Sequence, residues 1–266
     1  MSELVFVGLG LHDHMGISLQ GLEEMKTADT VFIELYTSLL PGFSHQSLSK
    51  LSGKELNILQ RKDLEENNGK IVLLAAEKGK TVLLVPGDPL IATTHVTLRI
   101  EAKKRGIKSR IVHGSSILSA AIGLSGLHSY KFGKSVTIPF ADENPSITPY
   151  AVISENRKLG LHTLCLLDIK AEDNRFLKIS DALKALLDIE AKRKEKAVTS
   201  NSLAVGVARA GSTRPTVKAG FVNDLLKQEF GDPPHTLIFT GRLHFMEAEA
   251  LVVLANAPGE VRRLAE

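Results

Sequence analysis

The sequence has almost no cysteine and no tryptophan. Cys165 is the single cysteine in 266 residues, and it stands in the apolar run Leu164-Cys-Leu-Leu167, which is typical of inert core. One cysteine excludes a disulfide scaffold and a cysteine-based zinc ribbon. The composition fits a reducing cytosol, so we expect a cytoplasmic location.

Long apolar runs and a large net charge are missing as well. No apolar stretch reaches the roughly 18 residues that a membrane span needs. A strand is predicted almost at once, at residues 4–7, so we expect neither a membrane partner nor a signal peptide. The formal net charge is only +3, and the basic residues are dispersed among acidic ones, which gives no reason to expect a nucleic-acid partner.

Several well-known binding and catalytic motifs are incomplete. Gly8-Leu-Gly10 follows the first predicted strand, but Asp13 occupies the third glycine position of a dinucleotide fingerprint. This disfavours an NAD-linked oxidoreductase. There is no Gly-x4-Gly-Lys-Ser/Thr phosphate loop, and Ser115 and Ser116 lack the Gly-x-Ser-x-Gly elbow of a hydrolase. His12-Asp-His14 has no second ligand cluster at a suitable spacing, so no metal site is predicted.

Strands and helices alternate along the chain, which indicates βα units and, in the first part, a mainly parallel sheet. The main predicted strands are residues 4–7, 30–34, 55–59, 82–85, 109–112, 135–139, 162–168, 203–208 and 236–239. Of the intervening helices, one is predicted at 93–105, one is expected to be capped by Ser180, and one is predicted at 221–228. We therefore predict an α/β protein with an N-terminal domain at 1–112, a linker and ligand-facing segment at 113–134, and a C-terminal domain at 135–266.

The stretch Pro86-Gly-Asp-Pro-Leu-Ile-Ala-Thr-Thr-His95 is the most informative part of the chain. It follows a buried strand and precedes a helix, and ligands of open α/β sheets bind at the carboxyl ends of strands. Glycine permits close backbone approach, and the two prolines stiffen the turn. Asp88 is then either a fixed carboxylate at a ligand site or the cap of the following helix.

Other strand ends have the same small-residue character. His113-Gly-Ser-Ser116 opens a helix, Leu167 ends a strand, Ala208-Arg-Ala-Gly-Ser212 ends another, and Gly231-Asp-Pro-Pro-His235 precedes a third. A ligand held mainly by backbone groups of both halves would suit this pattern. The local chemistry therefore predicts an α/β ligand-binding protein without an evident nucleophile.

These strand ends also carry a family resemblance. With its Gly-Asp-Pro turn, the chain resembles the tetrapyrrole methylase superfamily, and within it the diphthine synthases. The further motifs that carry the resemblance are Glu34-Leu-Tyr-Thr-Ser38, Gly126-Leu-His128, Tyr130-Lys-Phe-Gly-Lys-Ser135, Gly160-Leu-His-Thr-Leu164, Leu167-Asp-Ile-Lys-Ala171 and Phe230-Gly-Asp-Pro-Pro-His235.

The resemblance implies a homodimer of two α/β domains with an interdomain cofactor cleft. It also implies stepwise methylation of the amino group of a modified histidine on translation elongation factor 2, within diphthamide biosynthesis. S-adenosylmethionine would be the donor and S-adenosylhomocysteine the product. The donor contacts implied by matching positions are Leu11, Asp88, Ile91, Ser116, Ile117, Leu167, Ala210 and His235.

Catalysis need not involve a nucleophile, because a sulfonium is already an activated electrophile. The enzyme must align a neutral amine and exclude water. By position, Asp88 and His95 are the candidate catalytic bases, and Glu34, Tyr36 and Phe132 could favour a methylated ammonium. A tetrapyrrole C-methyltransferase of the same superfamily is the alternative, and a module that binds the donor without chemistry is another. By resemblance, three methyl groups are expected.

Overall fold

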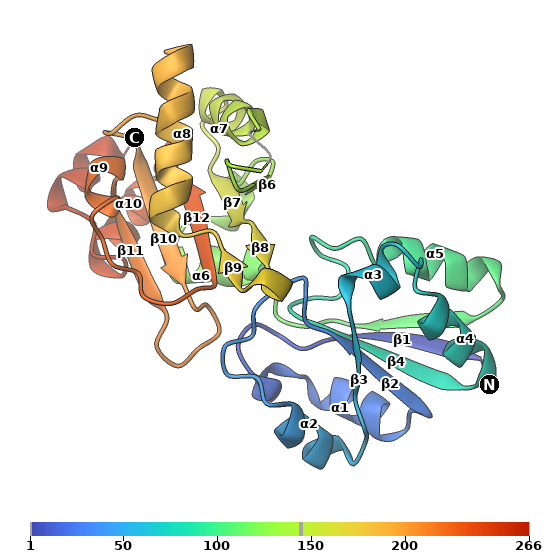
Figure 1. Ribbon diagram of the computed structural model, residues 1–266. Coiled ribbons are helices and arrows are strands. Elements are labelled where there is room, and N and C mark those ends of the chain that lie inside the picture. The colour runs from blue at the N-terminus through green and yellow to red at the C-terminus, as the bar shows by residue number, and fades with distance from the viewer. Residues whose placement is uncertain (1, 144–145, 266) are drawn as a thin grey trace. The chain divides into compact units, whose positions relative to one another are not determined.

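The computed structural model describes residues 2–143 and 146–265 (Figure 1). The chain forms two compact units. Unit 1 covers the chain up to Ile117 together with Lys170–Asn174, and unit 2 covers Leu118–Ile169 and the chain from Arg175 onward. The predicted domain limits lie near this division, and the linker predicted at 113–134 stays a prediction. No helix among the described residues is long and apolar enough to span a membrane.

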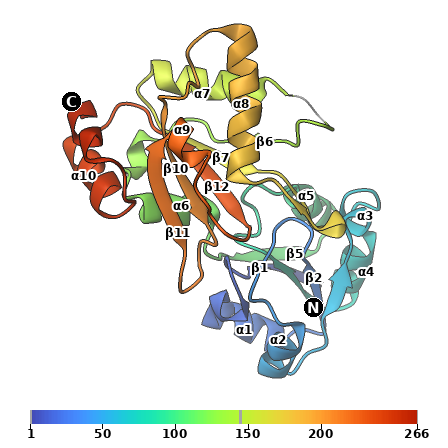
Figure 2. The same cartoon turned by 60° about the vertical axis from the view of Figure 1, so that its left-hand side comes forward.

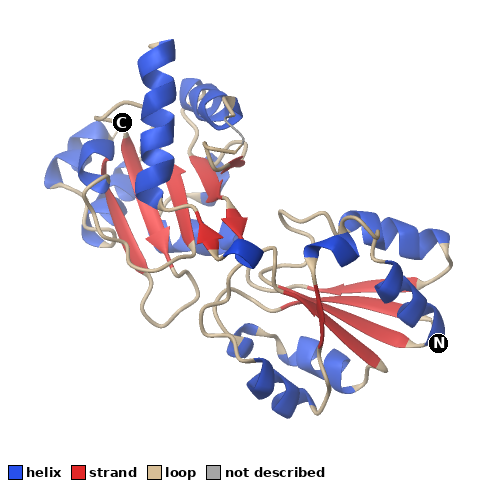
Figure 3. Cartoon of the chain, in the orientation of Figure 1, coloured by secondary structure: helices blue, strands red, loops and turns tan. Residues whose placement is uncertain are grey.

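Unit 1 is built on a five-stranded sheet in the order β3-β2-β4-β1-β5, and every neighbouring pair is parallel. Figure 3 draws the strands in red. The strands are β1 Glu3–Gly8, β2 Thr30–Glu34, β3 Asn57–Leu59, β4 Lys80–Val85 and β5 Lys108–Val112. The helices are α1 Leu19–Lys26, α2 His45–Ser52, α3 Arg61–Leu64, α4 Lys70–Lys78 and α5 Val96–Lys104, with a 3-10 turn, η1, at His14–Gly16.

Both faces of this sheet are buried, as expected for a parallel sheet. Leu4 and Phe6 of β1 pack into one core with α4 and α5, whereas Val5 and Val7 pack into another with α1 and α2. The predicted strand positions in this unit are confirmed. The helix predicted at 93–105 begins later, at Val96, and ends at Lys104; Ala92, just before the predicted start, adopts a left-handed φ of 56°.

Unit 2 contains a second five-stranded sheet in the order β11-β10-β12-β7-β6 (Figure 2). Only the β6–β7 pair is parallel among its described pairings; the other three are antiparallel. The strands are β6 Val136–Ile138, β7 Thr163–Leu167, β10 Leu203–Ala208, β11 Thr216–Phe221 and β12 His235–Phe239, with a separate ribbon of β8 Ile169–Lys170 and β9 Arg175–Phe176. The helices of this unit are α6 Ile117–Ser125, α7 Thr148–Lys158, α8 Ile179–Arg193, α9 Val222–Leu225 and α10 Phe245–Val253, with the 3-10 turns η2 Ser129–Lys131 and η4 Gly259–Leu264. The 3-10 turn η3 Ala171–Asp173, between β8 and β9, lies in the segment that belongs to unit 1.

Three details of unit 2 differ from the sequence-based expectation. Lys178, not Ser180, is the N-cap of α8, and Ser180 lies within the first helical turn. The helix predicted at 221–228 ends at Leu225. Strand β11 was not predicted, because an edge strand that carries Lys218 and Gly220 has a weak alternating pattern.

Glu247 of α10 is the buried polar centre of unit 2. Its carboxylate, with no exposed surface, accepts hydrogen bonds from Lys131 Nζ (2.5 Å), His162 Nε2 (2.9 Å) and the backbone N–H of His128 (2.8 Å) and His244 (2.8 Å). Burial opposes ionisation, yet these donors hold the pKa of Glu247 at about 2. Several motifs that carry the family resemblance therefore have a structural role here.

Unit 1 depends on a close contact among three glycines. A Cβ on Gly8 would lie 2.5 Å from the Gly87 carbonyl oxygen and 2.6 Å from the Gly114 nitrogen. A Cβ on Gly114 would overlap the same Gly87 oxygen and lie 2.9 Å from Gly8 Cα. Gly87 and Gly10 also exchange two backbone hydrogen bonds, of 2.7 and 3.2 Å. The chain segments that leave β1, β4 and β5 are thereby packed backbone to backbone.

We expect Gly114→Ala to destabilise the protein by at least about 2 kcal/mol, because the added methyl group meets backbone atoms that cannot rotate away. Its melting temperature should fall by roughly 4–8 °C. The matched control is Gly123→Ala in α6, where an added Cβ meets nothing within 4 Å; helix propensity predicts a gain of up to about 1 kcal/mol there. Equal melting temperatures for the two variants would show that the contact is not tight.

Candidate functional site

Five of the predicted site residues lie at one edge of the unit 1 sheet. Leu11 follows β1, Asp88 and Ile91 follow β4, and Ser116 and Ile117 follow β5. Strands β4, β1 and β5 are direct neighbours, and their carboxyl ends share an edge because the strands are parallel. The structure thus brings these five positions together at the glycine contact. An added Cβ on Gly87 would have a single neighbour within 4 Å, Ser115 O at 3.9 Å, so the backbone here is open.

Asp88 is the buried carboxylate of this edge, with 7% of its side chain exposed. One oxygen, Oδ1, accepts a hydrogen bond from the Leu90 backbone N–H at 3.3 Å. The other, Oδ2, lies 2.6 Å from Nδ1 of His113, whose side chain is 74% exposed. Asp88 does not cap α5, which begins after His95. Its side chain therefore joins two strand-end segments.

The loop between Asp88 and α5 is held by its own side chains. Thr93 Oγ1 donates a hydrogen bond to the Pro89 carbonyl at 2.9 Å, and His95 Nδ1 lies 3.2 Å from the same oxygen. Because a carbonyl can only accept, Nδ1 carries the hydrogen. His95 is 2% exposed, so this candidate base lies beneath the loop, whereas Ile91 at its tip is 41% exposed.

Below the loop, His95 faces a second buried titratable group, Glu34 at the carboxyl end of β2. His95 Nε2 lies 3.9 Å from Glu34 Oε1, beyond hydrogen-bonding distance, and has no hydrogen-bond partner. The Glu34 carboxyl accepts from Thr37 Oγ1 at 2.5 Å and from the Tyr36 and Thr37 N–H groups at 3.1 Å.

Burial decides the charge state of this pair. It raises the pKa of Glu34 to about 7 against the opposing hydrogen bonds, and it lowers the pKa of His95. Both groups therefore favour their neutral forms. The neighbouring charge is Arg61, whose guanidinium lies over the Tyr36 ring at 5.2 Å. Three residues were expected to favour a methylated ammonium. Of these, Glu34 and Tyr36 are buried, and the Phe132 ring packs against His162 in unit 2.

Three predicted site residues share one edge of the unit 2 sheet. Leu167 ends β7, Ala210 follows β10, and His235 begins β12. In the register of the sheet, His235 pairs with Ala208 of β10, and the next residue of β12 pairs with Leu166 of β7. Both ring nitrogens of His235 are used: Nδ1 accepts from the Ile179 N–H at 3.4 Å, and Nε2 donates to the Gly231 carbonyl at 3.1 Å. Burial lowers its pKa. Its backbone is thus better placed for a ligand than its ring.

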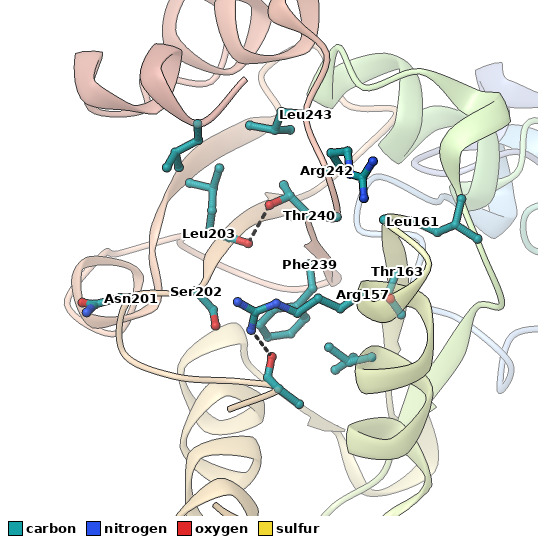
Figure 4. Close-up of a pocket in the computed structure, with 15 residues that line it drawn as sticks. Arg157, Leu161, Thr163, Asn201, Ser202, Leu203, Phe239, Thr240, Arg242 and Leu243 are labelled. Carbon is teal, nitrogen blue, oxygen red and sulfur yellow. Dashed lines mark hydrogen bonds between the residues drawn. The ribbon is translucent and has the colours of Figure 1, made fainter. Parts of the chain in front are cut away.

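Two cavities among the described residues lie away from these strand ends. One, of about 350 Å³, is lined by Arg157, Asn201, Leu203, Thr240 and their neighbours, at the opposite ends of β7, β10 and β12 (Figure 4). Arg157 there donates to the Ala197 carbonyl at 3.0 Å. Another, of about 390 Å³, lies at the start of β2 beside α4. None of the predicted donor contacts lines either of them.

The His12-Asp-His14 segment has a local structural role. Asp13 caps η1 by accepting a hydrogen bond from the Met15 N–H at 2.9 Å. No group of three or more His, Cys, Asp or Glu side chains that could hold a metal ion occurs among the described residues.

Sequence reasoning missed the pairing of Asp88 with His113. The two residues are 25 positions apart, and neither position indicates the other. The available signal was that both lie within three residues of the ends of strands that a parallel sheet can place near one another. Likewise, Glu34 ends β2 and His95 is the N-cap of α5, but nothing local indicated that they face each other.

Known proteins resemble the chain over nearly its full length. Residues 3–225 match the model of the tetrapyrrole (corrin/porphyrin) methylases. A diphthine synthase of Methanosarcina mazei is 48% identical over 97% of this chain and 98% of its own. One from Methanocaldococcus jannaschii is 45% identical over 95% and 99%. A crystal structure of a diphthine synthase superimposes with a TM-score of 0.91 at 42% identity, covering 99% of this chain and 100% of that one.

The raised pKa of Glu34 predicts how stability depends on pH. Its folded value of about 7 exceeds the ordinary value of 4.5, so the protonated form stabilises the fold and this contribution is lost as the pH rises from about 4.5 to 7. Relative to Glu34→Gln, which stays neutral, the native chain should lose roughly 2–3 kcal/mol across that window and nothing further above it.

Denaturant unfolding of both chains between pH 4.5 and 9 checks this. The contribution of His95, which has the opposite sign, is shared by the two chains and largely cancels in their difference. Parallel pH profiles would mean that Glu34 is already ionised in the folded protein at pH 5.

Proposed function

The chain belongs to the diphthine synthases of the tetrapyrrole methylase family, and from this premise we propose its substrates. It is a methyltransferase of diphthamide biosynthesis. We propose that it transfers methyl groups from S-adenosylmethionine to the amino group of the modified histidine on translation elongation factor 2, and that it does so repeatedly to give diphthine. The observation that carries the proposal is a sequence identity of 45–48% to diphthine synthases over nearly the full length of both chains.

The strand-end edge of unit 1 suits such a donor. Gly87 offers open backbone, Ile91 offers an exposed apolar side chain, and Asp88 offers a carboxylate with acceptor capacity beyond its two present bonds. These groups match a ligand that combines an adenine ring, ribose hydroxyls and an amino acid. The residues proposed to hold it are Leu11, Asp88, Ile91, Ser116, Ile117, Leu167, Ala210 and His235.

When bound, the donor supplies a methyl group already activated by its sulfonium. The chain's own residues must hold the amine in line with that methyl group and keep water away. They must also let a proton leave, because an alkyl ammonium has no lone pair to attack with. Most of the proposed contacts are apolar or small, which suits binding through backbone groups.

Tetrapyrrole methylation is the weaker alternative, because the relatives that match nearly end to end are diphthine synthases. The number of methyl groups, three by resemblance, stays a prediction. So do the homodimer and the cytoplasmic location.

The test is transfer of labelled methyl groups to elongation factor 2 that carries the precursor of the modified histidine. The same factor with an unmodified histidine is the control. We expect label on the precursor-bearing factor alone, and mass spectrometry of the modified peptide counts the methyl groups. Label on a tetrapyrrole substrate, with none on the factor, would overturn the proposal.

Asp88→Ala should weaken donor binding about 10–100-fold, because a hydrogen bond to a charged group contributes roughly 1.5–3 kcal/mol. Calorimetry with S-adenosylhomocysteine measures this without any turnover. Asp173→Ala is the matched control, since Asp173 is exposed in η3, and its affinity should be unchanged. An unaltered affinity for Asp88→Ala would remove Asp88 from the donor site.

A further inference from the structure

We infer that His113 is the general base that removes the proton from the substrate amine, and that Asp88 is the positioning residue that orients its ring. The inference rests on the proposed function. It concerns a residue that the sequence alone singled out only as a histidine at a strand end.

The geometry of the pair defines which ring nitrogen is free. His113 Nδ1 lies 2.6 Å from Asp88 Oδ2, and an ionised carboxylate can only accept a hydrogen bond, so Nδ1 carries the hydrogen. In the neutral ring Nε2 then carries the lone pair. Because 74% of the side chain is exposed, this nitrogen is open to an amine carried by another protein.

The position of the His113 ring is fixed through its own backbone and through its partner Asp88. Its own backbone continues into Gly114, which packs against Gly8 and Gly87 without room for a Cβ. Its partner Asp88 directly follows Gly87 and is fixed by the Leu90 N–H. A base that must meet a proton within hydrogen-bonding reach gains from such rigid support. Within the described part of the chain, Asp88 is the titratable group in contact with the ring.

The other candidate bases are engaged or covered. His95 is 2% exposed, with Nδ1 bonded to the Pro89 carbonyl and Nε2 turned toward Glu34. His235 uses both ring nitrogens within unit 2. Asp88 itself is 7% exposed, and each of its oxygens already has a partner. Among these groups, His113 combines a free nitrogen with wide exposure.

The proton transfer to His113 is balanced in atoms and charge. Nε2 takes one N–H proton from the substrate ammonium, and the electron pair left on that nitrogen forms the new bond to the methyl carbon. The carbon–sulfur bond breaks with its electron pair going to sulfur, so the positive charge passes from the sulfonium to the product amine. The imidazolium, stabilised by Asp88, releases its proton to solvent through its exposed face. Each further methyl group repeats the cycle.

His113→Asn removes the base but keeps the hydrogen bond to Asp88. The asparagine amide nitrogen can replace Nδ1 beside Asp88, while nothing replaces Nε2. We expect kcat to fall about 10²–10⁴-fold, with the calorimetric affinity for S-adenosylhomocysteine within about twofold of the native value. His45→Asn is the matched control, since His45 is also in unit 1 but contacts the Leu56 carbonyl. It should retain native turnover.

Two readouts distinguish a base from a structural side chain. Native kcat/KM should rise with pH as the general base loses its proton, and His113→Asn should lack this rise. Added imidazole should restore part of the activity of His113→Gly. In the donor-free protein, ¹⁵N NMR should find the neutral ring with hydrogen on Nδ1.

The outcomes separate the inference from its premise. If the native chain methylates the factor while His113→Asn keeps its turnover and pH profile, or NMR finds the hydrogen on Nε2, the inference is wrong and the proposed function stands. If the native chain transfers no methyl group to the factor, the proposed function fails and the inference fails with it.

Discussion

The backbone contact of Gly8, Gly87 and Gly114 is the constraint on which the site depends. Parallel strands bring their carboxyl ends to one edge, but side chains would normally keep the loops beyond them apart. Without Cβ atoms, the segments after β1, β4 and β5 pack directly on one another. The same contact leaves open backbone for a ligand and sets His113 beside Asp88.

Two histidines of this region have contrasting surroundings, and these decide what each can do. His95 is buried under the loop that carries Asp88, where desolvation favours the neutral forms of His95 and Glu34 and makes the pair part of the fold. His113 is exposed and keeps one nitrogen for chemistry. His95 is bonded to the loop through the Pro89 carbonyl, whereas His113 is exposed beside the buried Asp88.

Much of the fold could be predicted from the sequence, because local patterns specify it. Strands β1, β2 and β4 of unit 1 are largely apolar runs, and the ligand position expected at the turn after β4 stays a prediction. Edge strand β11 was missed because its alternation is weak, and the cap of α8 was misplaced because Ser180 resembles a cap in sequence alone. The antiparallel pairing in unit 2 and the Asp88–His113 pair depend on non-local contacts, which spacing does not reveal.

We propose that the strand ends joined by the glycine contact form the donor site. A crystal structure of the chain with S-adenosylhomocysteine tests it most directly. We expect the ligand against the backbone that follows β1, β4 and β5, within hydrogen-bonding distance of Asp88 or Ser116. A ligand seated instead in the cavity lined by Arg157 and Thr240, at the other edge of the second sheet, would contradict it.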